Sequence, residues 1–377
     1  MTRINTLYKQ RKYKVKDKIK GIQFIRFMAF LKIFYLHNGL YNEKLWNPGM
    51  GAAQAVSFFL VLGGAILGYR YIDEELHFSI INEVKFTWNR VKKLYYLHLV
   101  TLLYCALVVV YPVVIVYRDL WSIKMSLPVF LSNAFLIHSW FGPGYYYSFN
   151  GVSWYLCVML LMWAISLPVL IFLKKLTSRK LWPVFFFIIA VVLYAALRIY
   201  CYNVDTRGLD LEWYGYTFPP ARLVEYLFGM MIGIIVKKSR HRLKSKLFMV
   251  IFTVVELLAI VYWTYAPYQV AKTGTEGKIL LWLTCNMIIV TVFLYDKGLL
   301  SRIFSWKPLE VLGDISGEAF LIHQIIINIY AQIAMNIRGV SRFGNIYCTI
   351  TVLFFVLVIS YVVHFSKRNH RCNILFR

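Results

Sequence analysis

The sequence predicts an all-α integral membrane protein with about ten transmembrane helices and both termini in the cytoplasm. Its composition gives the first reason: of 377 residues, 60% are hydrophobic and only 16% are charged, unlike an ordinary soluble domain. The second reason is that the apolar residues gather in runs of about 20, the length a helix needs to cross a bilayer. The third is the distribution of the basic residues between these runs, which gives the helices a direction.

The first apolar run, 21–40, predicts a retained transmembrane helix, because it has full length and no small-residue cleavage site follows a short core. Nine further runs predict the remaining helices. They lie at about 52–69, 94–116, 151–173, 181–200, 218–236, 247–265, 278–295, 311–333 and 346–365.

The net charge of +25 would suggest nucleic acid as the partner of a soluble protein. With a cytoplasmic N-terminus, however, the inner segments carry 30 Lys and Arg and the outer segments 7, as the positive-inside rule requires. We therefore expect a lipid bilayer and no nucleic acid. The predicted organisation is a basic cytoplasmic arm (1–20), a ten-helix membrane domain (21–365) and a basic cytoplasmic tail (366–377).

Two polar side chains lie within the first predicted helix. Arg26 and His37 are eleven residues apart, so they project within about 20° of each other and lie about 16 Å apart along the axis. Ionisable groups inside a membrane are costly and usually face a polar interior. His37 is either a core histidine bonded to a neighbouring helix or a general base.

Basic residues follow the second predicted helix in a segment expected to be a cytoplasmic loop. Arg70, Arg90 and Lys93 either set the topology or bind the phosphates of a cytoplasmic donor, because guanidinium forks bind phosphate oxygens.

Other candidates lie in later helices. Arg222 and Glu225, three residues apart, predict an intramembrane ion pair. Glu318 and His323 share a predicted helix, and His323 is a second candidate for chemistry. Trp154 belongs to a group of external aromatic residues that fit either an interfacial belt or stacking on a sugar ring.

Several reaction classes lose support. The six cysteines are scattered without a CxxC pair, so no metal site is expected. The chain contains neither GxxxxGK[ST] nor GxGxxG, HExxH or GxSxG, which argues against ATP-driven transport and serine-hydrolase chemistry.

Four stretches in order resemble the acyltransferase 3 family of integral membrane acyltransferases. The first is Arg26, ten residues and His37, followed by SFFLVLGGAILGYR (57–70). The others are NRVKKLYYLHLVTLLY (89–104), SNAFLIHSWFGPGYYYSFNGVSWYLCVMLL (132–161) and LGDISGEAFLIHQ (312–324). The resemblance covers essentially the whole chain.

This resemblance implies transfer of an acyl group, commonly acetyl from acetyl-CoA, to a hydroxyl of a surface glycan or lipid-linked sugar in the bacterial cell membrane. It implies that His37 is the catalytic histidine, acting either as a general base or as a brief carrier of the acyl group, and that Arg26 is its partner. Arg90 and Lys93 match an Arg-x-x-Arg motif whose second arginine is replaced, which removes one guanidinium fork. Met159 stands where many relatives have glutamate, whose role is therefore absent or taken by Glu225 or Glu318.

An alternative of another class is a transporter or flippase of lipid-linked sugars, in which Arg26 and His37 line a pathway without catalysis. An inverted repeat or paired broken helices would favour it, and the sequence shows neither. A small-molecule receptor has no positive support.

Overall fold

A computed structural model describes residues 18–38, 51–111, 120–207, 210, 212–242, 245–270, 275–338 and 346–375. Within them, all regular structure is helical. The longer helices are α2 (Gly21–His37), α3 (Ala52–Tyr71), α4 (Ile80–Tyr111), α5 (Leu120–Ala134), α6 (Trp154–Ala164), α7 (Ser166–Thr177), α8 (Trp182–Thr206), α9 (Leu223–Ser239), α10 (Lys246–Val270), α11 (Thr275–Tyr295), α13 (Lys307–Arg338) and α14 (Ile346–Leu375). Short helices are η3 (His138–Trp140), η4 (Gly151–Ser153), η5 (Glu212–Thr217), η6 (Pro219–Arg222), η7 (Arg240–Arg242) and α12 (Leu299–Phe304).

In the part of the chain that the structure describes, the ten predicted spans coincide with helices, but not every helix has the dimensions of a span. Six of the described helices are long and apolar enough to cross a membrane, or seven if the bent pair α6 and α7 forms one span. The remaining three are α2, with 17 described residues, the short apolar stretch Ile279–Tyr295 of α11, and α13. The first half of α13 carries Glu310, Asp314 and Glu318. The chain is therefore a multi-pass membrane protein, and the count of ten stays a prediction.

One predicted loop is wrong. Arg70, expected in the loop 70–93, lies in the last turn of α3, and α4 begins at Ile80, so Arg90 and Lys93 lie on α4. This part of α4 is largely exposed and mixes charged with apolar residues, so a search for apolar runs cannot detect it. Helix α14 continues beyond the predicted last span to Leu375, so the described part of the predicted tail is helical, and its cytoplasmic position stays a prediction. Most of the predicted basic arm, 1–17, and the loop 39–50 lie outside the described residues.

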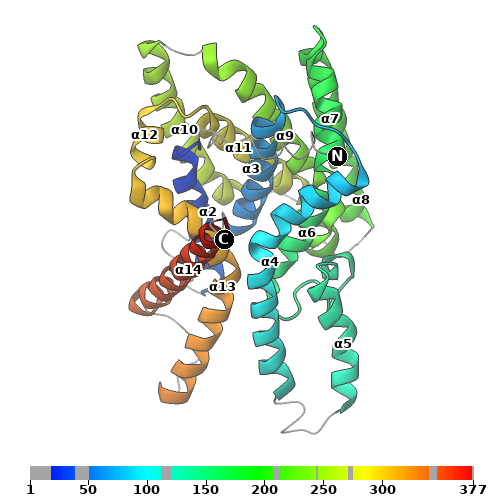
Figure 1. The fold of residues 1–377 in the computed structure, drawn as a ribbon, viewed down its shortest axis with the longest axis vertical. Coiled ribbons are helices and arrows are strands. Elements are labelled where there is room, and N and C mark those ends of the chain that lie inside the picture. Colours follow the sequence, from blue (N-terminus) through cyan, green and yellow to red (C-terminus); the bar gives the residue numbers. More distant parts are fainter. Residues whose placement is uncertain are drawn as a thin grey trace.

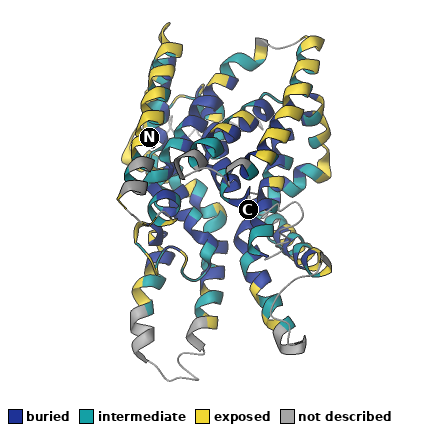
Figure 2. Cartoon of the chain, turned by 180° about the vertical axis from the view of Figure 1, so that it is seen from behind, coloured by how far each residue is buried: buried dark blue, intermediate teal, exposed yellow. Residues whose placement is uncertain are grey.

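The helices form an inner group and an outer group (Figure 1). In α3, 72% of the membrane-length window is buried, and in the window of α9 67%, whereas the values are 11% for α8 and 17% for α10. Figure 2 shows the buried residues in the middle of the molecule and the exposed ones along the peripheral helices. The apolar outer surface of α8 and α10 is thus what a helix in contact with lipid presents.

Glycines bring the two inner helices α3 and α9 into backbone contact. A Cβ on Gly64 would collide with the carbonyl of Tyr226, and one on Gly229 with the carbonyl of Val61. Small residues four positions apart allow membrane helices to approach closely where lipid gives no hydrophobic driving force. The α3–α9 pair is therefore the rigid centre against which the neighbouring helices pack.

Helix α2 packs against α13 and α3. Gly313 of α13 lies directly against the backbone carbonyl of Gln23, so the two helices cross in close contact at this point. Because α2 and α13 run side by side, the polar residues that each carries can meet along one seam.

Candidate functional site

The seam between α2 and α13 joins two histidines that are far apart in the sequence. His37 is the last residue of α2, and its Nδ1 lies 2.7 Å from Nε2 of His323 on α13. The two rings are nearly parallel, with an angle of 12° between their planes. Both candidates from the sequence therefore belong to one site.

The hydrogen bonds assign a proton to each ring. Nδ1 of His323 lies 2.7 Å from the carbonyl oxygen of Phe320, which can only accept, so His323 carries its proton on Nδ1. Its Nε2 is then an acceptor, and His37 donates to it from Nδ1. Neutral His37 is left with a lone pair on Nε2, the form that a general base needs.

Packing fixes both rings. His323 is fully buried and meets Phe30 and Phe34 of α2 at ring-centroid distances of 5.8 and 6.4 Å. Directly after His37, buried Asn38 donates to the hydroxyl of Thr349 on α14 over 2.7 Å. The end of α2 is thus tied to α13 and α14, and His37 cannot swing away without breaking these contacts.

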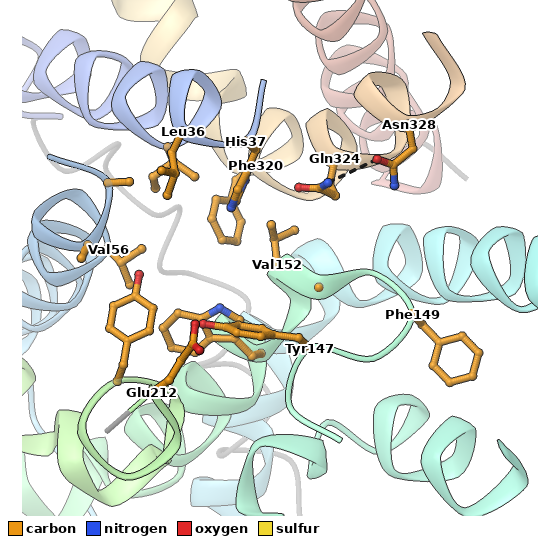
Figure 3. A pocket seen from close by; sticks show the side chains of 16 residues that line it. Leu36, His37, Val56, Tyr147, Phe149, Val152, Glu212, Phe320, Gln324 and Asn328 are labelled. Carbon is orange, nitrogen blue, oxygen red and sulfur yellow. Dashed lines mark hydrogen bonds between the residues drawn. The ribbon is translucent and has the colours of Figure 1, made fainter. Parts of the chain in front are cut away.

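A cavity of about 500 Å³ opens beside His37. Figure 3 shows His37 and Phe320 on one side of it and Glu212 and Tyr147 on the other. Its lining comes from α2, α3, α6, α13, η4, η5 and the segment before η4. The volume lies within the range of small-molecule sites, and the described lining combines apolar and aromatic walls with a few polar side chains.

Aromatic side chains form one wall of the cavity. Trp154 is buried at the start of α6, and its ring centroid lies 4.8 Å from that of Tyr216 in η5. Both residues line the cavity. The sequence allowed two roles for Trp154, in an interfacial belt or in stacking on a sugar ring; the structure places it beside the cavity, and sugar stacking stays a prediction.

Arg222 and Glu225 form the predicted ion pair. Arg222 Nε lies 2.9 Å from Glu225 Oε2, and both side chains are buried. Ser57 of α3 donates to the other carboxylate oxygen over 2.5 Å. Glu225 also interacts electrostatically with Tyr155 of α6, the helix that carries Met159, so it lies near the helix in which relatives place a glutamate.

Arg26 and His37 both lie on the side of α2 that faces α13, as the spacing between them predicts. Its guanidinium donates to Gln23 over 2.7 Å and interacts electrostatically with Asp314 and Glu318 of α13. Glu318 also lies 3.2 Å from His364 on α14. Arg26 therefore belongs to a network of opposite charges, about three helical turns from His37.

The predicted donor-binding residues lie toward the Arg26 end of the seam. Arg70 interacts electrostatically with Arg26. Arg90 stacks its guanidinium over Phe86, 3.3 Å from the ring centroid, and faces Tyr71, the neighbour of Arg70, at 5.1 Å. The backbone carbonyl of Lys93 accepts a hydrogen bond from Lys367.

Lys367 connects this group to Arg26. Its ammonium lies 3.7 Å from Glu318, which interacts with Arg26. We call Arg26, Arg70, Arg90, Lys93, Asp314 and Glu318 the arginine end of the seam. His37, His323 and the cavity are its histidine end.

Sequence reasoning missed several polar residues of the cavity. Glu212 and Asn328 line it, but neither stands in a recognisable motif. Gln324 ends the stretch 312–324 and Tyr147 belongs to the external aromatic residues, yet neither was assigned to a site with His37; the four-residue spacing of Gln324 and Asn328 was the signal that could have linked these two. Among the described residues, no group of three His, Cys, Asp or Glu side chains could hold a metal ion.

A comparison with protein families places nearly the whole chain in one of them. The model of the acyltransferase domain of acyltransferase 3 matches residues 19–365. No curated protein matches, and no solved structure matches. The match spans α2 to α14 and includes both ends of the seam. The chain belongs to the acyltransferase 3 family.

Proposed function

We propose that the chain transfers an acyl group, in the first instance acetyl, from cytoplasmic acyl-CoA to a hydroxyl of a cell-surface or lipid-linked polysaccharide. It would do so within a bacterial cell membrane. Membership of an acyltransferase family supports the reaction class. The observation that carries the proposal is the hydrogen bond between His37 and His323 at the edge of a cavity.

In this proposal, His37 is the general base. Its Nε2 takes the proton of an acceptor hydroxyl in the cavity while the hydroxyl oxygen attacks the thioester carbonyl carbon. The C–S bond then breaks, and the coenzyme A thiolate recovers the proton from His37. General-base help of this kind contributes about 10²–10⁴-fold. An ester and free coenzyme A thiol are the products, so the chain ends the cycle unchanged.

His323 acts through His37. As an acceptor for the Nδ1 proton, it holds the His37 ring in one orientation and one tautomer. The position of His37 at the C-terminus of α2 adds to this, because the negative end of the helix dipole stabilises the imidazolium formed during the reaction.

The donor would approach from the arginine end. Arg26, Arg70, Arg90 and Lys93 offer positive charge for the phosphates of acyl-CoA, and its pantetheine arm separates those phosphates from the thioester. The excess of Lys and Arg in the predicted inner segments supports a cytoplasmic arginine end. The acceptor would then enter from the outside, at the histidine end.

Membranes carrying the full chain and incubated with labelled acetyl-CoA provide the test. We expect label in the acceptor glycan, and a loss of about 10²-fold or more in His37→Ala at equal abundance in the membrane. A flippase of lipid-linked sugars would transfer no label. Unchanged transfer by His37→Ala at normal abundance would contradict the proposed role.

A further inference from the structure

The charge of the cavity wall opposite His37 suggests which acceptors it takes. Among the described lining residues, Glu212 is the one with a formal charge at neutral pH, in a chain whose net charge is +25. None of those lining residues is a lysine or an arginine. Glu212 is an exposed residue that lines the cavity, and its carboxylate attracts cations and repels anions there, because the low-dielectric wall beside it concentrates its field.

Glu212 is held in place by the turn that carries it. The carboxylate of Asp210 accepts hydrogen bonds from the backbone N–H groups of Glu212 and Trp213, at 3.0 and 3.2 Å. The indole of Trp213 in turn donates to the carbonyl of Ser139 over 3.1 Å. Hydrogen bonds thus hold the π-helical turn η5 at its first backbone N–H groups and through the indole of Trp213, as expected for a turn that positions a functional group.

Tyr147 completes this part of the wall. Its phenol interacts with Glu212, and burial together with the nearby Tyr216 and Glu212 raises the pKa of Tyr147 above its ordinary value. The phenol therefore stays protonated and adds no second negative charge to this wall, and the Glu212 carboxylate remains an acceptor for donors in the cavity.

On the adjacent wall, α13 presents two side-chain amides, Gln324 directly after His323 and Asn328 one turn further along. Gln324 donates to Asn328 over 3.4 Å, and both line the cavity (Figure 3). Amides both donate and accept, and with the rings of Trp154 and Tyr216 they suit a ring that has hydroxyls on its edge and an apolar face.

From this lining, and resting on the proposed function, we propose that Glu212 determines acceptor specificity. The cavity takes a hydroxylated ring that is neutral or carries an amine near the reacting hydroxyl, and it rejects a ring with a carboxylate there. Glu212 accepts hydrogen bonds from the hydroxyl or ammonium groups of the acceptor. An acidic acceptor would meet this carboxylate without any compensating cation from the described lining.

A thiol probe measures the charge of the cavity without needing the natural acceptor. In the full chain in membranes, Gln324→Cys is treated with a cationic trimethylammonium methanethiosulfonate or an anionic sulfonate analogue. The thiolate forms a mixed disulfide and methanesulfinate leaves. The unsubstituted chain corrects for native cysteines, and a free thiol in solution gives the intrinsic ratio of the two rates.

We expect the cationic reagent to be favoured about tenfold over that intrinsic ratio, because a carboxylate across a half-solvated cavity attracts the cationic reagent and repels the anionic one. Adding Glu212→Gln should return the ratio to the intrinsic value. The matched control Glu75→Gln, which changes an exposed carboxylate outside the cavity, should leave the preference intact. A ratio that Glu212→Gln does not change would overturn the assignment.

A second measurement separates this inference from the proposed function. Membranes receive labelled acetyl-CoA and methyl glucoside, methyl glucosaminide or methyl glucuronide, three rings that differ in charge. We expect transfer to the first two at least about tenfold above the third, with the difference reduced in Glu212→Gln. Equal transfer to all three would contradict the inference alone. A cation-selective cavity with no transfer to these rings or to the native glycan would contradict the proposed function and leave the cavity charge established.

Discussion

The two ends of the α2–α13 seam differ in how their polar side chains are partnered. At the arginine end, cations and carboxylates neutralise one another: Arg26 faces Asp314 and Glu318, and Asp314 also lies 2.6 Å from Lys18, a neighbouring residue outside this group that reaches Glu310 at 2.7 Å. At the histidine end, His37 and His323 form a hydrogen-bonded pair, and no described ion pair involves either ring.

Under the proposed function, this difference assigns donor binding to the arginine end and proton transfer to the histidine end. A base must have a free lone pair, and the histidine end leaves one on His37 beside a cavity. Cations that bind a phosphorylated donor need a polar surrounding that keeps them in place until the donor arrives, and the carboxylates of the arginine end supply it. Variants at the two ends should therefore affect different kinetic constants.

The largest effect in this comparison is expected for His323→Phe. Phenylalanine keeps a ring among Phe30, Phe34 and Phe320 but cannot accept the Nδ1 proton of His37. We expect kcat to fall about 10²-fold while the KM for acyl-CoA stays the same. His323→Gln, whose amide oxygen can accept, should recover part of the loss, and exposed His241→Gln serves as a control. A rise in KM without a fall in kcat would place His323 in donor binding instead.

The next effect is expected for Arg90→Ala at the arginine end. Removing the guanidinium that stacks on Phe86 should raise the KM for acyl-CoA about tenfold with little change in kcat, because a charge-assisted contact to phosphate is lost. Arg90→Lys should lie between, since lysine keeps the charge without the planar fork. Lys85→Ala on the same helix changes an exposed cation and should have no effect. A variant Arg90→Ala with unchanged KM would remove this residue from the donor site.

A smaller effect of opposite sign is expected for Glu318→Gln. Glu318 attracts Arg26, His364 and Lys367, and its charge competes with the phosphates of an incoming donor. We expect the KM for acyl-CoA to fall about threefold, a modest gain because His364 and Lys367, which face buried Glu318, are partly exposed. Glu75→Gln again provides the control. An increased KM would mean that Glu318 orders the cations more than it competes for them.

The sequence predicted the helices and one face of α2 well, because both follow from local patterns. Apolar runs located all ten predicted segments on helices, and the spacing of Arg26 and His37 placed both on the side that meets α13. These features depend on residues within one helix, where the 3.6-residue period fixes direction.

Features that depend on two distant segments could not be predicted. His37 and His323 are 286 residues apart, and their contact depends on how closely α2 and α13 cross, which in turn depends on Gly313 meeting a backbone carbonyl. Glu212 lies in a short π-helical turn between two spans, without a periodic pattern to mark it. The start of α4 was missed because its first turns are exposed.

The central claim is that His37 and His323 act as one unit, and a double-mutant cycle tests it most directly. Acyl transfer from labelled acetyl-CoA is measured in membranes with His37→Ala, His323→Ala and both substitutions, at matched abundance. If His323 acts only through His37, the double variant should be no slower than His37→Ala alone. Losses that multiply, so that the double variant falls below His37→Ala by the full factor of His323→Ala, would contradict the pair.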